Sequence, residues 1–366
     1  MNRTSLRITS SAVTALALAL SLGACAAVNE RPGYAGDVAG SSLSGRLNGA
    51  GSSAQEAAVN AWKAGIQTAN PNLTVNYDPA GSGAGREQFI AGGVAFAGSD
   101  AYLTDEELEA ASKRCGGDVV EIPTYVSPIA VIFNLEGVDE LKLDAKTIGA
   151  IFEGSVTQWN DPAIAATNPD AELPSGKITA VHRSDDSGTT KNFTDYLDKA
   201  SDGGWTGGEV ETWPLKRGEA AEGTSGVVAA VKGGSGTIGY VDESQAGDLG
   251  QVKVKVGDSF TDPTPESAAR ALDTATPVPG RAATDLALDI DRGSTVKGVY
   301  PIVLASYMMA CQTYEDPTTA ELVKNWLTYV TSVEGQAAAA ETAGAAPLTS
   351  DFSIKATAVI LTITGA

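Results

Sequence analysis

Two long apolar segments constrain the architecture of this 366-residue chain more than any other feature. The first, IPTYVSPIAVIFNL, runs from Ile122 to Leu135, and the second, VYPIVLASYMMACQTY, runs from Val299 to Tyr314. Each is rich in β-branched and aromatic residues and is flanked by polar residues, which predicts a long buried strand. Two such strands, far apart in the chain, can cross from one lobe to another and back. The sequence therefore predicts two hinged lobes with a ligand cleft between them.

Strand, turn and helix alternate three times in the first third of the chain. The predicted units are a strand, a turn over 49–53 and a helix over 54–68; a strand over 73–77, a turn over 81–85 and a helix; and a strand that ends at Asp100 before a helix capped by Thr104 with Glu107. This alternation predicts an α/β fold with mixed sheets flanked by helices. It places Ser52, Ser53, Ser82 and Asp100 at carboxyl ends of strands, where open α/β sheets bind ligands.

The stretch HRSDDSGTT, residues 182–190, has the chemistry to hold an oxyanion. Arg183 offers a planar fork of donors, and Ser187, Gly188 and Thr189 can add hydroxyl and backbone N–H groups where a helix begins. The helix is predicted by the apolar spacing of KNFTDYLDKA, with Ser187 or Thr189 as its N-cap. A capped polar loop without a ligand has the same composition, so this stretch alone leaves both interpretations open.

The N-terminus has the pattern of an export signal. Arg3 and Arg7 precede an apolar run that is too short for a comfortable transmembrane helix and ends in LGAC, residues 22–25. LGAC resembles the lipobox of bacterial lipoproteins, in which Cys25 becomes the lipidated first residue; an ordinary secretory signal is the alternative. We expect a lipoprotein signal peptide over 1–24, a flexible tether over 25–44, and a protein that is lipid-anchored on the extracytoplasmic face of the cell membrane.

The charge and the cysteines limit the partners and the compartment. The formal net charge is −20, and it becomes −22 once Arg3 and Arg7 are removed with the signal. Nucleic acid is therefore not expected as a partner, and an anion must be held by local hydrogen bonds and helix dipoles. Besides Cys25, only Cys115 and Cys311 are present. Two thiols outside the cytoplasm can form a disulfide, and the sequence leaves their pairing open.

Three other kinds of site fit the sequence less well. GAGSSA, residues 49–54, matches a dinucleotide fingerprint, but the segment before it lacks the apolar run of a first Rossmann strand. His182, the one histidine, stands beside Arg183, and no G-x-S-x-G elbow accompanies it. Neither a cysteine pair at ligand spacing nor an acidic calcium loop is present. We therefore expect no metal, no cofactor and no catalytic residue, and keep a secreted phosphatase-like hydrolase as the less favoured alternative.

Asp100 is the residue that says most about which anion binds. A carboxylate repels a fully ionised anion such as sulfate, yet it accepts a hydrogen bond from an oxyanion that keeps a proton at neutral pH, as phosphate does. A helix cap before TDEEL is the alternative role for Asp100. If Asp100 does face the ligand, the pocket should prefer phosphate.

Six motifs in order resemble the phosphate-binding proteins of bacterial phosphate ABC transporters, the PstS family. They are LNGAGSS (47–53), YDPAGSGAG (77–85), FAGSD (96–100), IFEGSVTQWNDPAI (151–164), HRSDDSGTT (182–190) and TIGYVD (237–242). The resemblance runs from about Leu43 to the C-terminal region. It implies a two-lobed periplasmic-binding-protein type II fold, with lobe one over 45–134 plus 300–366 and lobe two over 135–299. It also implies that the protein binds inorganic phosphate and delivers it to a permease and its ATPase; another tetrahedral oxyanion is the alternative ligand.

The resemblance further implies which residues hold the phosphate. They are Ser53, the backbone N–H of Ala54, Ser82, Asp100, Arg183, Ser187, Gly188 and Thr189. Asp185 is implied as the acidic partner that fixes Arg183. The family often has Thr then Phe where this chain has Ser53 and Ala54, so the hydroxyl and the N–H are kept and the aromatic cover over that corner is lost.

Overall fold

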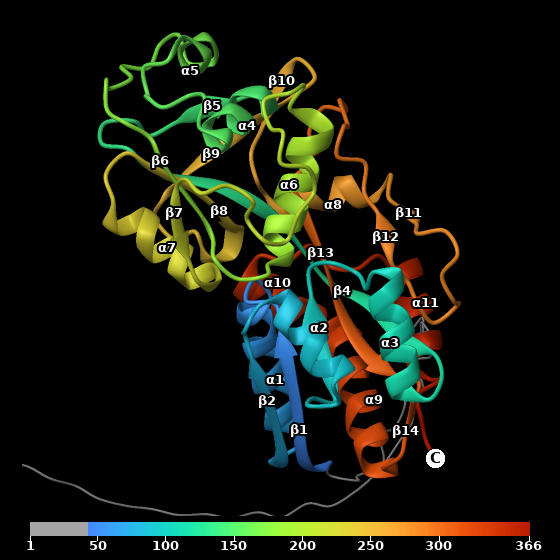
Figure 1. Cartoon of the computed structure of the whole chain (residues 1–366). Helices are drawn as coiled ribbons and strands as arrows, with labels where there is room; N and C mark the ends of the chain where they lie inside the picture. Colours follow the sequence, from blue (N-terminus) through green and yellow to red (C-terminus); the bar gives the residue numbers. More distant parts are fainter. Residues whose placement is uncertain (1–42) are drawn as a thin grey trace, which may run out of the picture. The chain divides into compact units, whose positions relative to one another are not determined.

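The computed structural model describes residues 43–366. Figure 1 shows its elements in chain order by colour. The predicted signal peptide, Cys25 and all but the last two residues of the predicted tether lie outside the described residues.

One large mixed sheet runs through the described residues. Its strands are β1 (Ser44–Gly51), β2 (Asn72–Asp78), β3 (Phe96–Ser99), β4 (Val119–Asn134), β5 (Leu141–Leu143), β6 (Thr179–Arg183), β7 (Glu219–Ala221), β8 (Thr237–Asp242), β9 (Gly250–Val256), β10 (Ser259–Thr261) and β13 (Val303–Cys311). The main order is β2-β1-β3-β13-β4-β8-β6-β7, and β9 pairs with β4, β5 and β10. Two small pairs lie apart from it: β11 (Thr276–Pro277) with β12 (Leu288–Asp289), and β14 (Thr313–Tyr314) with β15 (Thr364–Gly365).

The helices flank this sheet. They are α1 (Glu56–Ala69), α2 (Ser82–Ile90), α3 (Asp105–Cys115), α4 (Ala145–Glu153), α5 (Pro162–Thr167), α6 (Gly188–Ala200), α7 (Gly223–Gly233), α8 (Pro265–Leu272), α9 (Pro317–Thr331), α10 (Val333–Ala343) and α11 (Ser350–Ile360), with a short 3-10 turn η1 (Glu243–Gln245). The predicted cap of α3 is confirmed: Thr104 and Glu107 form a capping box, and Gly116 ends the helix in the left-handed conformation.

Strand β4 joins two parts of the sheet. Its residues from Val119 to Pro128 pair with β13, and those from Ile129 to Asn134 pair with β8. All of β4 except Asn134 is buried, which explains its continuous apolar sequence. The second crossing lies just before β13, where the N–H of Ile129 donates to Ile302 O at 2.7 Å. The predicted two-lobed α/β fold with two crossing strands is confirmed, and β4 can be followed between the two groups of elements in Figure 1.

Each lobe packs around its own hydrophobic core. Lobe one includes Trp62 and Trp326, whose rings meet edge to face at 6.4 Å. Lobe two includes Phe193 and Tyr240, whose rings stack at 4.3 Å. Residues of α8 such as Ala268, which the sequence placed in lobe two, pack in the core of lobe one. The exact lobe boundaries therefore stay a prediction.

Two turns are shorter than predicted, and the prediction over 49–53 and 81–85 was wrong in this respect. Strand β1 continues through Gly51, and α2 begins at Ser82. A Cβ on Gly51 would lie 1.8 Å from Gly98 O, and one on Gly85 would lie 2.4 Å from Gly51 Cα. These glycines let β1, β3 and α2 approach closely, which a local sequence pattern does not distinguish from a turn.

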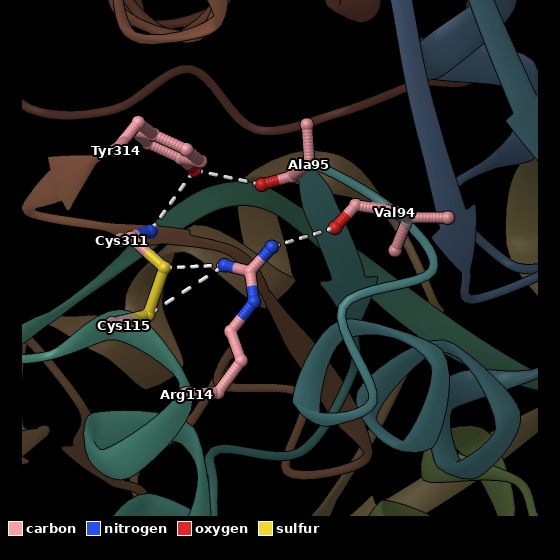
Figure 2. The surroundings of a disulfide bond; sticks show 6 residues. All are labelled: Val94, Ala95, Arg114, Cys115, Cys311 and Tyr314. Atoms are coloured by element: carbon pink, nitrogen blue, oxygen red, sulfur yellow. Dashed lines mark hydrogen bonds between the residues drawn. A yellow bond between two sulfur atoms is a disulfide. The ribbon is translucent and has the colours of Figure 1, made fainter. Parts of the chain in front are cut away.

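A disulfide joins Cys115 at the end of α3 to Cys311 at the end of β13 (Figure 2). Arg114 donates to Cys311 Sγ and, at 3.2 Å, to Val94 O, and its guanidinium lies 4.8 Å from the ring centroid of Phe89. Cys311 pairs with the first residue of β4 in the sheet. The bond therefore ties the C-terminal end of α3 to the end of β13, next to the first residue of β4.

Candidate anion-binding site

The structure brings the two halves of the predicted site into contact. Ser53 and Asp100 follow β1 and β3, and Ser82 begins α2 on lobe one; Gly188 and Thr189 begin α6 on lobe two. A Cβ placed on Gly188 would lie 2.7 Å from both Asp100 Cβ and Ser82 Oγ. The Thr189 hydroxyl donates to Asp100 Oδ2 at 3.1 Å. These contacts mean that the lobes are closed on each other at this point.

The start of α6 supplies directed donors. Ser187, and not Thr189, is the N-cap: its Oγ accepts from the N–H of Thr190 at 3.1 Å, and its own N–H donates to Glu211 O at 3.2 Å. The N–H groups of Gly188 and Thr189 lie in the first turn and have no acceptor within the helix. Together with the helix dipole they make this end of α6 suited to an anion.

Arg183 is the cation of the site. It is only 2% exposed, its Nε donates to Asp185 Oδ1 at 2.7 Å, and its Nη2 contacts Asp185 Oδ2. Burial would raise the pKa of Asp185, but the hydrogen bonds and charge of Arg183 and the N–H of Gly223 outweigh it and lower that pKa. Asp185 therefore stays ionised and occupies Nε and one proton of Nη2, which leaves the Nη1 protons and the second Nη2 proton for other acceptors.

Asp100 is buried and held by hydroxyl groups. Burial raises its pKa, whereas the hydroxyls of Ser306, Ser52 and Thr189 and the charge of Arg183 lower it, and the net shift is upward. Ser306 donates to Oδ1 at 2.5 Å. The backbone N–H of Asp100 donates to Ser82 Oγ at 3.1 Å. Because Thr104 caps α3, the alternative role of Asp100 as that cap is excluded.

Ser53 and Ala54 are held from lobe two. Ser53 Oγ accepts from the N–H of Thr224 at 3.1 Å and lies 3.1 Å from the Thr224 hydroxyl. Gln245 donates to Ser53 O at 3.0 Å and to Ala54 O at 3.2 Å. The N–H of Ala54, predicted as a phosphate donor, donates to Ser52 Oγ at 3.1 Å, so a ligand there has to share or replace that acceptor. The Ala54 side chain is buried in the core of lobe two.

The sequence analysis missed four residues of this region. Thr224, Gln245 and Ser306 contact the predicted binding residues directly, and Arg86 lies beside them through its bond to Ser99. Thr224 had a usable signal, because it opens the stretch TSGVVAAVKGG, whose composition is that of a short helix ended by glycines. Ser306 had none, because it lies inside an apolar strand, next to a shift in register between β13 and β4.

An ion pair spans the two lobes beside the site. Arg86 of α2 is 4% exposed and donates to Glu107 at 2.8 Å and to Ser99 Oγ at 2.9 Å within lobe one. Its Nη2 reaches Glu211 at 2.5 Å on lobe two. Glu211 also accepts the N–H of Ser187 through its backbone oxygen, so the cross-lobe pair is linked to the start of α6.

His182 is engaged structurally. Its ring stacks on Trp213 with centroids 4.8 Å apart, and its Nδ1 lies 2.9 Å from Arg183 O. Within residues 43–366, no group of three or more His, Cys, Asp or Glu side chains is placed to hold a metal ion. In the same described part, no helix has the length and apolar character needed to cross a bilayer.

The two-lobed fold, with a buried arginine, hydroxyl groups and the start of a helix gathered where the lobes meet, is that of a solute-binding protein of the periplasmic type. Residues 37–334 match the model of the PBP superfamily domain, so the chain belongs to that superfamily.

Sequence relatives identify the family within this superfamily. The phosphate-binding protein PstS3 of Mycobacterium bovis is 39% identical over 287 residues, which cover 77% of this chain and 77% of the relative. The phosphate-binding protein PstS 2 of Mycobacterium tuberculosis is 36% identical over 320 residues, which cover 84% of this chain and 86% of the relative. The chain belongs to the PstS family of phosphate-binding proteins, and the resemblance stated from the six motifs is confirmed.

Solved structures share the fold at lower identity. A high-affinity periplasmic phosphate-binding protein bound with phosphate (PfluDING) superposes with a TM-score of 0.70 at 23% identity, covering 86% of this chain and 93% of that one. A phosphate-binding protein from Stenotrophomonas maltophilia gives a TM-score of 0.66 at 22% identity, with the same coverage.

Proposed function

We propose that this protein binds inorganic phosphate outside the cytoplasm and delivers it to the permease and ATPase of an ABC transporter. One observation carries the proposal: Arg183, the start of α6 and Asp100 converge from two lobes on one buried place. Membership in the PstS family and the names of the relatives support phosphate as the ligand.

The donors and the acceptor in this place have complementary tasks. The guanidinium of Arg183 and the first N–H groups of α6 face the charged oxygens of the ligand. The hydroxyls of Ser53, Ser82 and Ser187 supply further hydrogen bonds, and the Thr189 hydroxyl can join them only by releasing Asp100. Asp185 orients the arginine through two hydrogen bonds.

Asp100 selects an anion that carries a proton. A buried carboxylate accepts a hydrogen bond from the P–O–H of phosphate, and arsenate offers the same group. Sulfate has no proton at neutral pH. A sulfate oxygen and the Asp100 carboxylate would therefore face each other as two buried negative charges with no hydrogen bond between them. The same geometry therefore binds phosphate and rejects sulfate.

The proposal extends to the membrane. The N-terminal sequence supports a signal peptide over 1–24 and lipidation of Cys25, so that the protein works as an anchored receptor on the extracytoplasmic face. The receptor performs no chemistry. A secreted phosphatase-like hydrolase is the alternative, and it is disfavoured because the one histidine is stacked on Trp213 and bonded to the backbone.

Isothermal titration with phosphate, arsenate and sulfate tests the proposal. We expect the first two to bind and sulfate to bind far more weakly. Asp100→Asn should narrow the ratio of phosphate to sulfate affinity by about 10- to 100-fold, because a hydrogen bond to a buried charged group contributes about 1.5–3 kcal/mol. The control is Asp198→Asn, which makes the same charge change at an exposed position of α6.

The possible results of these titrations distinguish the role of Asp100, the proposed function and the alternative hydrolase. Sulfate binding as tight as phosphate in the unchanged protein would refute the role of Asp100. No binding of any of the three oxyanions would refute the proposed function. Turnover of a phosphate ester without added metal would instead favour the hydrolase.

A further inference from the structure

Helix α7 begins between two parts of the anion site, although the sequence motifs did not include it. Thr224, its second residue, is 2% exposed. Its N–H and its hydroxyl both lie 3.1 Å from Ser53 Oγ, on the other lobe. The residue before it, Gly223, donates its N–H to Asp185 Oδ1 at 3.1 Å. The first turn of α7 thus contacts both Ser53 and Asp185, the carboxylate that is paired with Arg183.

The hydroxyl of Ser53 has limited capacity for hydrogen bonds. It carries one proton and two lone pairs. The N–H of Thr224 occupies one lone pair. Between Ser53 Oγ and Thr224 Oγ1 either atom can donate, so the proton of Ser53 can point to Thr224 or away from it.

An anion beside Ser53 decides between these two arrangements. If Ser53 donates to Thr224, its remaining lone pair faces the negative oxygen of the ligand, which is unfavourable. If Thr224 donates to Ser53, both lone pairs of Ser53 Oγ are filled and its proton is free for the ligand. The second arrangement is therefore favoured whenever an oxyanion occupies the site.

We propose that Thr224 is a positioning residue of the anion site, which fills both acceptor positions of Ser53 Oγ and so makes the Ser53 hydroxyl a pure donor to the oxyanion. The inference rests on the proposed function and deepens it. A pure donor at Ser53 cannot accept the ligand's proton. That proton is then left to Asp100, whose carboxylate can accept it. Thr224 and Asp100 together thus fix the orientation of a protonated oxyanion.

Thr224→Val tests the inference, because valine keeps the shape and the backbone N–H and removes only the hydroxyl. We expect phosphate affinity in titration to fall about 10-fold, the effect of one hydrogen bond that acts on a charged ligand. Thr224→Ser should restore wild-type affinity. The matched control is Thr237→Val: Thr237 is also buried in lobe two, and its hydroxyl donates to Val231 O at 2.8 Å, outside the site. T237V should bind phosphate as the unchanged protein does.

A double-mutant cycle shows whether Thr224 acts through Ser53. In a Ser53→Ala background, Thr224→Val should change phosphate affinity less than about twofold, because the hydroxyl that it positions is gone. Additive losses would overturn the inference, and so would wild-type affinity in T224V. If T224V does not fold, Thr224→Ala carries the same test with a smaller side chain. Failure of the unchanged protein to bind phosphate would instead refute the proposed function, so the two failures are distinguishable.

Discussion

Replacing Gly188 with alanine should stop the lobes from closing while leaving each lobe folded. Gly188 is the first residue of α6 and its φ is not positive, so alanine suits the local backbone. The added Cβ would lie 2.7 Å from Asp100 Cβ and Ser82 Oγ, and 3.1 Å from the carbonyl carbon of Asp100. Asp100 Cβ and its carbonyl carbon are fixed to the backbone and cannot swing away, and the Ser82 hydroxyl can rotate only by giving up the N–H of Asp100. The strain therefore falls on the contact between the lobes.

The size of the effect follows from the distances. Carbon atoms in contact prefer about 3.5–4.0 Å, so the lobes have to separate by about 1 Å at this point. The bond from Thr189 to Asp100 is already 3.1 Å long and would be lost, and the 2.6 Å bond from Asn192 to Asp100 O would be stretched to its limit. The donors of α6 would recede from a ligand by the same amount. Two such hydrogen bonds contribute about 3 kcal/mol, so phosphate affinity should fall roughly 100-fold.

Titration calorimetry of Gly188→Ala with phosphate measures this loss, and thermal unfolding without phosphate checks that the variant is folded. Gly233→Ala is the matched control: Gly233 ends α7, and a Cβ there meets nothing within 4 Å. We expect wild-type affinity for G233A. An affinity of G188A within about threefold of the unchanged protein would refute the argument that this closed contact belongs to the phosphate-bound state.

Two other predictions concern stability. Asp242 accepts a hydrogen bond from the hydroxyl of Tyr125, and burial raises the pKa of Asp242 from 3.8 to about 7 despite hydrogen bonds from nearby hydroxyls. The protonated carboxyl group therefore contributes its full stability to the fold below about pH 4. About 4 kcal/mol of this stability is lost as the pH rises from there through 7. Urea unfolding at pH 4 to 8 should show the stability difference between Asp242→Asn and the unchanged protein shifting in favour of the variant; a constant difference would contradict the raised pKa. The disulfide of Cys115 and Cys311 closes a loop with a sequence separation of 196, for which chain entropy gives about 5 kcal/mol. Replacing both cysteines by serine should lower the unfolding free energy by about that amount, and a loss below about 1 kcal/mol would show that the constraint on the unfolded chain is unimportant.

Elements set by short-range physics could be predicted from the sequence. The capping box of Thr104 lies within four residues, and the apolar run of β4 reflects burial on both faces. Ser187 at the N-cap of α6 has the same local origin. The strand-to-helix junctions that carry Ser82 and Asp100 follow from the alternation of the α/β pattern.

Contacts between distant segments could not be predicted in this way. Thr224 and Ser53 are 171 positions apart, and Ser306 and Asp100 are 206 apart. The second contact also depends on the register shift beside Ser306, which no local pattern encodes. Glycines were ambiguous for a similar reason: Gly51 serves close packing of β1 on β3, and the same residue type in the same context is typical of a turn.

The balance of charge in the site explains why these distant contacts matter. Arg183 is paired with Asp185, and Asp100 adds a further carboxyl group, in a chain whose formal net charge is −20. An anion therefore gains little from net charge and depends on directed hydrogen bonds from neutral groups and from the start of α6. Such bonds weaken steeply with distance and angle, so they hold the ligand only when both lobes are in place. This is why the close approach at Gly188 and the hold of Thr224 on Ser53 should govern affinity as strongly as the residues that touch the ligand.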